Sequence, residues 1–162
     1  MASFPAFMAP LIATKLRVLL LAGSAAAVAG GGMLASWSPR QPLPGPIPAA
    51  VLRVVDGDTL NVRGRIWINQ ELETSVRLRD ADAPELNGAC EAERVKALAA
   101  RAHLESRAAG RMVVLHDITN DKYGGRVVAR VTTESGEDLG AGLIALGLAV
   151  AYDGRGERRS WC

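Results

Sequence analysis

The first 48 residues contain no aspartate or glutamate, and no charged residue of either sign lies between Arg17 and Arg40. Within this uncharged stretch, residues 18–37 are apolar over about the length that spans the hydrocarbon core of a bilayer. Lys15 and Arg17 precede the stretch, which favours an outward-facing position for the rest of the chain. We therefore expect residues 1–37 to be a signal peptide or a membrane anchor of an exported, periplasmic or extracellular protein.

Two interpretations of this leader stay open. Ala27-Val28-Ala29 is typical of a signal-peptide cleavage site, so the leader could be removed. Alternatively, residues 18–37 remain as an anchor and make the membrane a partner of the chain. Three consecutive glycines weaken the anchor, and they also disfavour a buried helix of a soluble domain.

Cysteine is scarce as well. The chain has only Cys90 and Cys162, with no Cys-x-x-Cys pair and no cluster with histidine, which disfavours a cysteine-based metal site. In the oxidising compartment of an exported protein the two cysteines can form a disulfide. Closing that loop would stabilise the fold by about 4 kcal/mol in the chain-entropy account. We predict the disulfide, and two free thiols are the alternative.

An excess of positive charge is missing from the part of the chain after the leader. Of 19 basic and 17 acidic residues, only Lys15, Arg17 and Arg40 belong to the first 48 residues. The remainder has 16 basic against 17 acidic residues, a net charge of −1. Binding to nucleic acid would therefore need a local basic patch. The total of 162 residues has room for one domain of ordinary size.

Residues 38–49 carry five prolines, which is typical of an extended spacer, so we expect the folded domain over residues 50–162. The pattern after the spacer is mostly that of β-strands. We predict strands at Val51–Val55, Leu60–Val62, Ile66–Ile68, Ser75–Arg79, Met112–Leu115, Val127–Val131 and Leu148–Ala151. The polar residues 70–74 are interpreted as a loop.

One long helix is predicted at Glu91–Ala109, a stretch rich in alanine, glutamate, arginine and leucine that ends before Gly110. Its apolar stripe would consist of Val95, Leu98, Ala99, Ala102 and Ala109. Leu139–Leu146 is predicted as a second, short helix. Several strands with one packed helix and one short helix indicate a small α+β, mainly β, barrel-like domain.

Two short segments concentrate acidic groups: Asp56–Thr59, with the sequence DGDT, and Arg77–Glu85, with the sequence RLRDADAPE. A hard cation such as Ca²⁺ requires several oxygen ligands at about 2.3–2.6 Å. Phosphodiester hydrolysis uses a cation, an arginine and a carboxylate base around one phosphorus. Each segment also has a purely structural interpretation, the first as a hairpin turn and the second as an acidic helix N-terminus.

A third segment, Asp121–Arg126 with the sequence DKYGGR, and the stretch Gly142–Ala149 follow in order. Together these segments of residues 51–152 resemble the staphylococcal nuclease (thermonuclease) family. The resemblance implies an OB-fold, a five-stranded barrel with flanking helices, after the N-terminal hydrophobic segment. It also implies a Ca²⁺-dependent endonuclease that hydrolyses phosphodiester bonds of DNA, RNA or both. We expect it to be a monomer.

The resemblance assigns the acidic residues to a metal site and a base. Asp58 and Asp82 would ligate Ca²⁺, together with the backbone carbonyl of Ala83. Asp56 would support the ion through water. Glu85 would be the general base that activates the attacking water.

The resemblance assigns the basic and aromatic residues to the substrate. Arg77 and Arg126 would hold the phosphate and stabilise the charge that develops on it, as the planar guanidinium group suits. Lys122 and Tyr123 would contact a neighbouring phosphate. Tyr152 would lie along the pocket for a base.

The chain departs from the family pattern in its third segment and at its C-terminus. The family's Tyr-Gly-Arg has an extra glycine here, Gly125, so either a one-residue bulge leaves Arg126 in place or Arg126 points elsewhere. We favour the bulge. The family's long C-terminal helix is replaced by a tail, Gly154–Cys162, whose basic run Arg155–Arg159 we interpret as solvated rather than as a phosphate-binding patch.

A different class of protein remains as the alternative: a non-catalytic OB-fold module that binds nucleic acid or protein. The near-neutral charge of the folded part favours it mildly. An inert module, however, has no need of Asp58, Asp82, Glu85 and Arg77 together, and this combination favours the nuclease.

Overall fold

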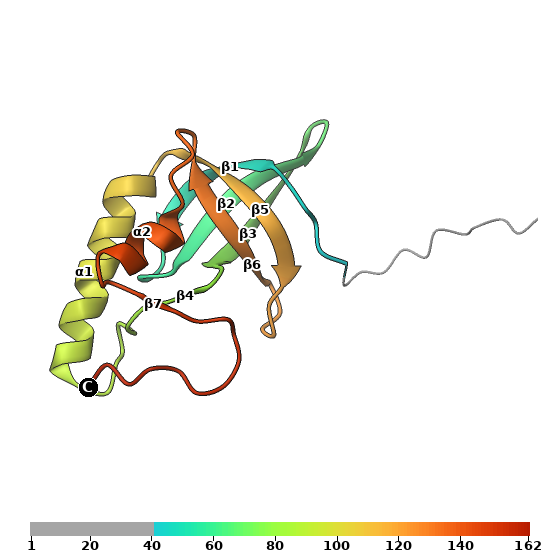
Figure 1. The fold of residues 1–162 in the computed structure, drawn as a ribbon. Helices are drawn as coiled ribbons and strands as arrows, with labels where there is room; N and C mark the ends of the chain where they lie inside the picture. Colours follow the sequence, from blue (N-terminus) through green and yellow to red (C-terminus); the bar gives the residue numbers. More distant parts are fainter. Residues whose placement is uncertain (1–40) are drawn as a thin grey trace, which may run out of the picture. The chain divides into compact units, whose positions relative to one another are not determined.

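The computed structural model describes residues 41–162, which form a closed five-stranded barrel with two helices (Figure 1). Around the barrel the strands follow the order β1-β2-β3-β6-β5. Their bounds are β1 Ile47–Val54, β2 Thr59–Trp67, β3 Gln70–Leu78, β5 Met112–Asn120 and β6 Arg126–Thr133. This confirms the predicted α+β, mainly β, fold class. The first strand begins at Ile47, inside the proline-rich segment interpreted as a spacer.

The predictions for residues 1–37 lie outside the described residues. Among residues 41–162, no helix combines the length and the apolar character needed to cross a bilayer.

The barrel interior follows from alternation along the strands. In β3, Val76 and Leu78 are buried in the core, while Arg77 between them points to the outer face. Strand β6 runs parallel to β3 and closes the barrel, with Arg77 opposite Val128 and Ser75 opposite Arg126. Because neighbouring positions in a sheet share a face and side chains alternate, Arg77 and Arg126 lie on the same outer face.

The prediction that residues 70–74 form a loop is wrong, because β3 begins at Gln70 and pairs with β2 along its whole length. This end of the hairpin extends away from the barrel, so both faces meet solvent and the strand has no apolar alternation (Figure 1). A cross-strand ion pair between Arg63 and Glu73, at 2.5 Å, joins its two strands. Because backbone pairing with β2 holds this end of the strand and no face of it is buried, its residues are polar like those of a loop.

The long helix α1, Glu91–Ala108, has the predicted extent but not the predicted face. Its buried residues are Ala97, Ala100, Leu104 and Ala108. Val95 and Leu98, placed in the apolar stripe by the sequence, are 55% and 59% exposed. The helix packs through alanines because a small side chain permits close approach, so size outweighs hydrophobicity here.

The second helix α2, Leu139–Ala145, begins after Asp138, whose side chain accepts a hydrogen bond from the Ala141 N–H at 3.0 Å. Two short strands, β4 Ala81–Asp82 and β7 Val150–Ala151, pair antiparallel beside the barrel. Beyond β7, residues 153–162 have no regular secondary structure and return to the start of α1 (Figure 1). We refer to residues 153–162 as the C-terminal strap.

Candidate active site

The turn before β2 directs Asp58 inward. Asp56 Oδ1 accepts the Asp58 backbone N–H at 3.0 Å, which holds the turn closed. A Cβ atom at Gly57 would lie 2.8 Å from the Cβ atoms of both Ala83 and Ala100. Only glycine therefore allows this turn to pack between β4 and α1, and the packing buries Asp58 to 3% exposure.

Asp58 and Asp82 are brought together by Arg77. The Arg77 Nη2 atom lies 2.8 Å from an oxygen of Asp58 and 2.8 Å from Oδ1 of Asp82. Both oxygens of Asp58 have further donors, the Thr59 hydroxyl at 3.0 Å and the Ala83 N–H at 3.1 Å. The two acidic segments predicted from the sequence thus converge, although they are about 20 residues apart along the chain.

The charge of Asp58 is strongly affected by its surroundings. Its pKa is raised to about 7: burial is the largest cause, the charge of Arg77 lowers the pKa, and the charge of Asp56 raises it. A buried carboxyl group of this kind becomes more acidic when a cation binds beside it.

The residues after β4 meet a side chain from the C-terminal strap. Arg158 donates from Nε to Asp82 Oδ1 at 2.7 Å, and its Nη2 atom is 2.5 Å from the same oxygen. Its Nη1 atom is 2.6 Å from Glu85 Oε1, and Nη2 lies 3.4 Å from the carbonyl oxygen of Ala83. Burial lowers the pKa of Arg158, but the bonds to Asp82 and Glu85 outweigh it and raise this pKa overall.

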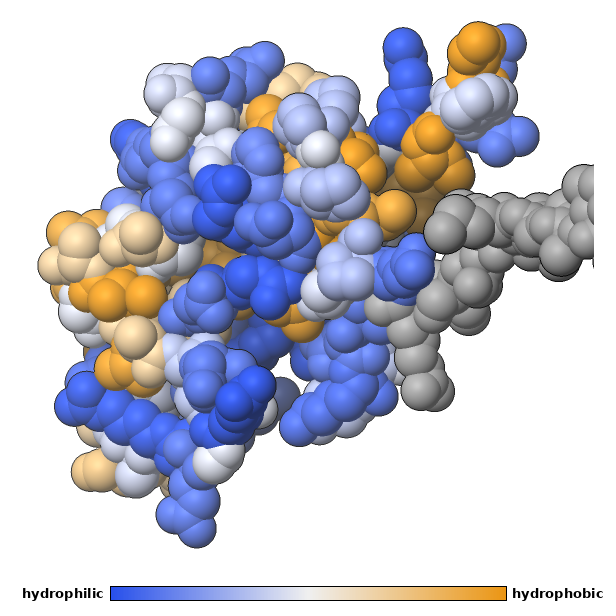
Figure 2. Space-filling model, turned by 45° about the vertical axis from the view of Figure 1, so that its right-hand side comes forward, coloured by the Kyte–Doolittle hydropathy of each residue, from blue (hydrophilic) through white to orange (hydrophobic). Residues whose placement is uncertain are grey.

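A cleft of about 540 Å³ opens on the outer face beside this acidic cluster. Figure 2 shows that the face turned toward the viewer is largely hydrophilic and hollowed in its lower half. The six predicted catalytic and substrate-binding residues line this cleft: Arg77, Glu85, Lys122, Tyr123, Arg126 and Tyr152. Arg158 lines it as well. The structure therefore places all six on one surface.

Arg126 stands at the start of β6, immediately after Gly125, which has the positive φ of 78° that glycine tolerates. Its Nε atom donates to Asp121 Oδ2 at 2.6 Å, and its guanidinium carbon lies 5.0 Å from the centre of the Tyr123 ring. Burial raises the pKa of Asp121, but the bonds from Arg126 outweigh it and lower this pKa overall. Arg126 thus lines the cleft while its charge is paired with Asp121.

Tyr152, which lines the cleft, makes two hydrogen bonds. Its backbone N–H donates to the Asp80 carbonyl at 3.1 Å, and its hydroxyl donates to the Gly156 carbonyl of the strap at 3.0 Å. Lys122, which also lines the cleft, has its Nζ atom 5.1 Å from the centre of the Tyr123 ring.

The donor set fits a hard cation. Asp58, Asp82 and the Ala83 carbonyl offer oxygen atoms alone, the ligand type that Ca²⁺ prefers. Asp82 Oδ2 is buried and has no hydrogen-bond partner within residues 41–162. Such an orphaned carboxylate oxygen is unusual in a folded protein, and a bound cation would satisfy it.

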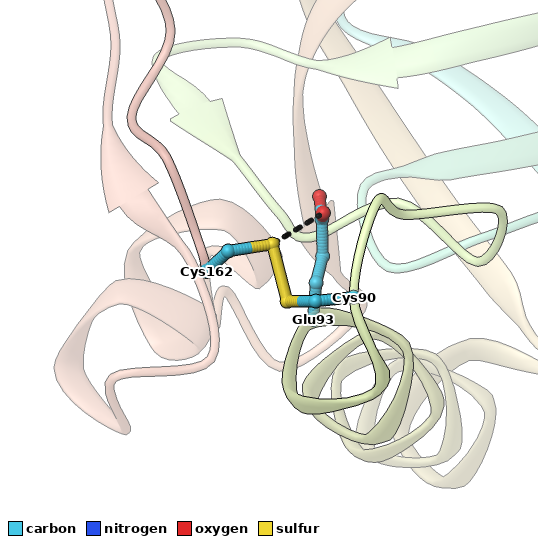
Figure 3. Close-up of side chains that lie close together, drawn as sticks. All are labelled: Cys90, Glu93 and Cys162. Atoms are coloured by element: carbon cyan, nitrogen blue, oxygen red, sulfur yellow. Dashed lines mark hydrogen bonds between the residues drawn. A yellow bond between two sulfur atoms is a disulfide. The ribbon is translucent and has the colours of Figure 1, made fainter.

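The predicted disulfide between Cys90 and Cys162 is confirmed, with Cα atoms 6.0 Å apart (Figure 3). Glu93 lies beside it, with an oxygen 3.7 Å from the Cys162 sulfur. Cys90, Glu93 and Cys162 are close enough to hold a metal ion, but sulfurs joined to each other are not thiolate ligands. The bond joins the end of the strap to the start of α1.

Residues 75–160, just over half of the chain, match the family described as Staphylococcal nuclease homologue. The chain therefore belongs to the staphylococcal nuclease homologue family, which is consistent with nuclease activity and a nucleic-acid substrate. No curated protein matches the chain. The family match begins in β3 and includes Glu85 and Arg158, whereas Asp56 and Asp58 precede it.

Arg158 is a basic residue of the cleft that the sequence did not predict there, because its basic run was interpreted as a solvated tail. One signal was available. Cys162 lies four residues further on, and a disulfide to Cys90 brings this tail back to the helix that follows Glu85.

Proposed function

We propose that the protein is a Ca²⁺-dependent nuclease that hydrolyses phosphodiester bonds of DNA, RNA or both. The observation that carries this proposal is the cleft, in which Glu85 and the phosphate-binding candidates Arg77 and Arg126 surround one volume beside the Asp58–Asp82 pair. Membership of the staphylococcal nuclease homologue family supports it independently.

Asp58, Asp82 and the Ala83 carbonyl would hold the ion, with Asp56 supporting it through water. Bound there, Ca²⁺ would supply positive charge to a phosphoryl oxygen and help to orient the attacking water. Asp56 also has a structural part, because it closes the turn that carries Asp58.

The chain's own groups would supply the remaining chemistry. Glu85 is 49% exposed at the cleft, where its carboxylate would accept a proton from the attacking water. Arg77 is already oriented by two carboxylates, so its guanidinium would meet the phosphate with little loss of side-chain freedom. Arg126 would exchange its bond to Asp121 for the phosphate, while Lys122, Tyr123 and Tyr152 would contact the flanking nucleotides.

A chelator-controlled assay tests this function. The purified full-length chain should degrade single-stranded DNA with Ca²⁺, stop when a chelator is added and resume when excess Ca²⁺ is restored. Activity that is indifferent to the chelator contradicts the metal role. No activity under any of these conditions favours the second candidate, a non-catalytic module that binds nucleic acid or protein.

That second candidate is favoured by one observation. Arg77 and Arg158 already neutralise much of the charge of Asp58, Asp82 and Glu85, so the folded domain does not require a cation to hold these acids together. Binding without cleavage of single-stranded DNA would identify such a module.

We also propose that residues 1–37 export the chain to the periplasm or outside the cell, either as a cleaved signal peptide or as an anchor. The Cys90–Cys162 disulfide supports export, because such bonds persist in oxidising compartments. The proline-rich residues before Ile47, where β1 begins, would then separate the leader from the folded domain.

A further inference from the structure

The strap places Arg158 on the oxygen atoms proposed to hold the cation. Its guanidinium is bonded to Asp82 and Glu85 and approaches the Ala83 carbonyl. Two of these three groups are proposed ligands, and the third is the proposed base. In the part of the chain that the structure describes, no other basic residue of the strap contacts Asp82, Ala83 and Glu85 together.

A guanidinium in this position and a bound cation exclude each other. Ca²⁺ lies about 2.3–2.6 Å from each ligand oxygen. Arg158 Nη2 is already 2.5 Å from Asp82 Oδ1 and 3.4 Å from the Ala83 carbonyl oxygen, so a cation shared by these two oxygens would lie where the guanidinium now lies. A cation on the unpartnered Asp82 Oδ2 would lie beside the same guanidinium. The two positive groups would also repel each other at that separation.

The strap is attached at both ends, which keeps Arg158 near the site. At one end the Tyr152 N–H bonds to Asp80, and at the other Cys162 is joined to Cys90. Trp161, at 8% exposure, packs into the protein beside the disulfide, and Lys96 and Arg159 lie over its ring. A side chain held this close binds as if it were present at high local concentration.

Arg158 itself remains movable. Its side chain is 41% exposed, whereas Asp82 is 1% exposed. The strap has no regular backbone pairing along residues 153–162. The acidic partner is therefore fixed by the fold, and the basic partner can be displaced without unfolding the barrel.

We propose that Arg158 is a tethered competitor of the metal ion: the disulfide-closed strap holds its guanidinium on Asp82, Ala83 and Glu85, and Ca²⁺ must displace it. This inference rests on the proposed metal role of Asp82. While Arg158 is bound, Glu85 Oε1 accepts its charged hydrogen bond, which makes the carboxylate a weaker base toward a water proton. Displacement of Arg158 would expose the ligands and release the base in the same movement.

The test is Ca²⁺ binding measured by calorimetry on the full chain without substrate. Arg158→Gln should bind Ca²⁺ at least about tenfold tighter than the wild type, because charged hydrogen bonds that compete for the ligands are lost. Arg155→Gln, which removes an equal charge from the same strap, should change the affinity by less than about twofold at physiological ionic strength.

A cysteine variant tests the tether. Cys90→Ser with Cys162→Ser should also tighten Ca²⁺ binding, and it should add nothing in a chain that already carries Arg158→Gln, since both changes remove the same competitor. Equal or weaker Ca²⁺ affinity of Arg158→Gln overturns the proposal. Weaker binding of a nucleoside 3′,5′-bisphosphate with unchanged Ca²⁺ affinity also overturns it, and assigns Arg158 to the phosphate instead.

Asp82→Asn separates this inference from the proposed function. If the wild type binds Ca²⁺, Asp82→Asn does not, and Arg158→Gln equals the wild type, only the competition fails. If neither the wild type nor Arg158→Gln binds Ca²⁺ up to about 10 mM, beyond the range of weak extracellular sites, the metal role and the competition fail together. Binding by Arg158→Gln alone supports both.

Discussion

The acidic cluster and the C-terminal strap meet at the same oxygen atoms but are held in different ways. Asp82 lies in the β4–β7 strand pair, and Asp58 follows Gly57, whose turn packs closely against Ala83 and Ala100. Both acidic side chains are nearly inaccessible to solvent. The strap has no regular structure and depends on a few side-chain contacts and one disulfide. The proposed ligands are thus held by the folded core together with Arg77 of β3, whereas the second positive charge beside Asp82, that of Arg158, is carried by the irregular strap.

This difference assigns separate physical tasks to the two regions. Buried carboxylates without compensating charge would destabilise the fold, so some positive group must accompany them. A permanent cation from the core could not leave when a metal ion or a phosphate arrives. An arginine on a strap neutralises the acids in the resting protein and can still move.

The largest expected effect contrasts an acid of the cleft with an acid of the strap. Glu85→Gln removes the proposed base and should lower turnover by about 10²–10⁴-fold, the usual contribution of such a group, while circular dichroism stays unchanged. Glu157→Gln changes an exposed acid of the strap and should leave turnover within about twofold, as expected for a screened surface charge. Equal turnover of Glu85→Gln and the wild type would remove Glu85 as the base.

Releasing the strap should reduce stability without disturbing the barrel. Replacing Cys90 and Cys162 by serine opens a loop with a sequence separation of 72 residues. The free energy of unfolding in urea should fall by about 4 kcal/mol in the chain-entropy account. Thiol titration of the denatured wild type should find no free thiol, and two thiols per chain would show that the bond does not form.

Replacing two glycines by alanine compares the effect on stability of a closely packed turn with that of an ordinary strand position. Gly57→Ala would force a Cβ to 2.8 Å from two other Cβ atoms, and it should lower stability by about 1–3 kcal/mol. Gly64→Ala in β2 meets nothing closer than 3.7 Å and should change stability by less than about 1 kcal/mol. Similar effects at both sites would show that the turn does not constrain the position of Asp58.

The last expected effect is a pH dependence of the stability of the chelated protein, and it comes from the acidic cluster. The pKa of Asp58 rises from 3.8 to about 7 on folding, so between these values the folded state keeps a proton that the unfolded chain has lost. The stabilisation is complete below pH 3.8 and is lost as the pH rises through about 7. Asp58→Asn should therefore gain stability relative to the wild type between pH 4.5 and 7.5, measured by urea unfolding with excess chelator. A constant difference across this range contradicts the raised pKa.

Local signals allowed the sequence to predict much of the fold. The extent of α1 follows from a run of strong helix formers that ends near Gly110, and the hairpin before β2 follows from Asp56-Gly57. The buried face of α1 did not follow, because the helix packs through Ala97 and Ala100 while the larger Val95 and Leu98 meet solvent. The beginning of β3 did not follow either, since pairing with β2 stabilises it without an apolar face.

The order of residue types along the chain is enough to identify two acidic segments and the arginines near them. It also identifies the long helix that follows the second acidic segment and the cysteine at position 162. These are local or pairwise properties, so they can be recognised along the chain. The contact of Arg158 with Asp82 and Glu85, in contrast, appears only in the folded protein. That contact joins residues more than 70 positions apart, and it depends on where β7 ends beside the barrel and on where the disulfide holds the end of the strap. No local preference of the strap specifies either position.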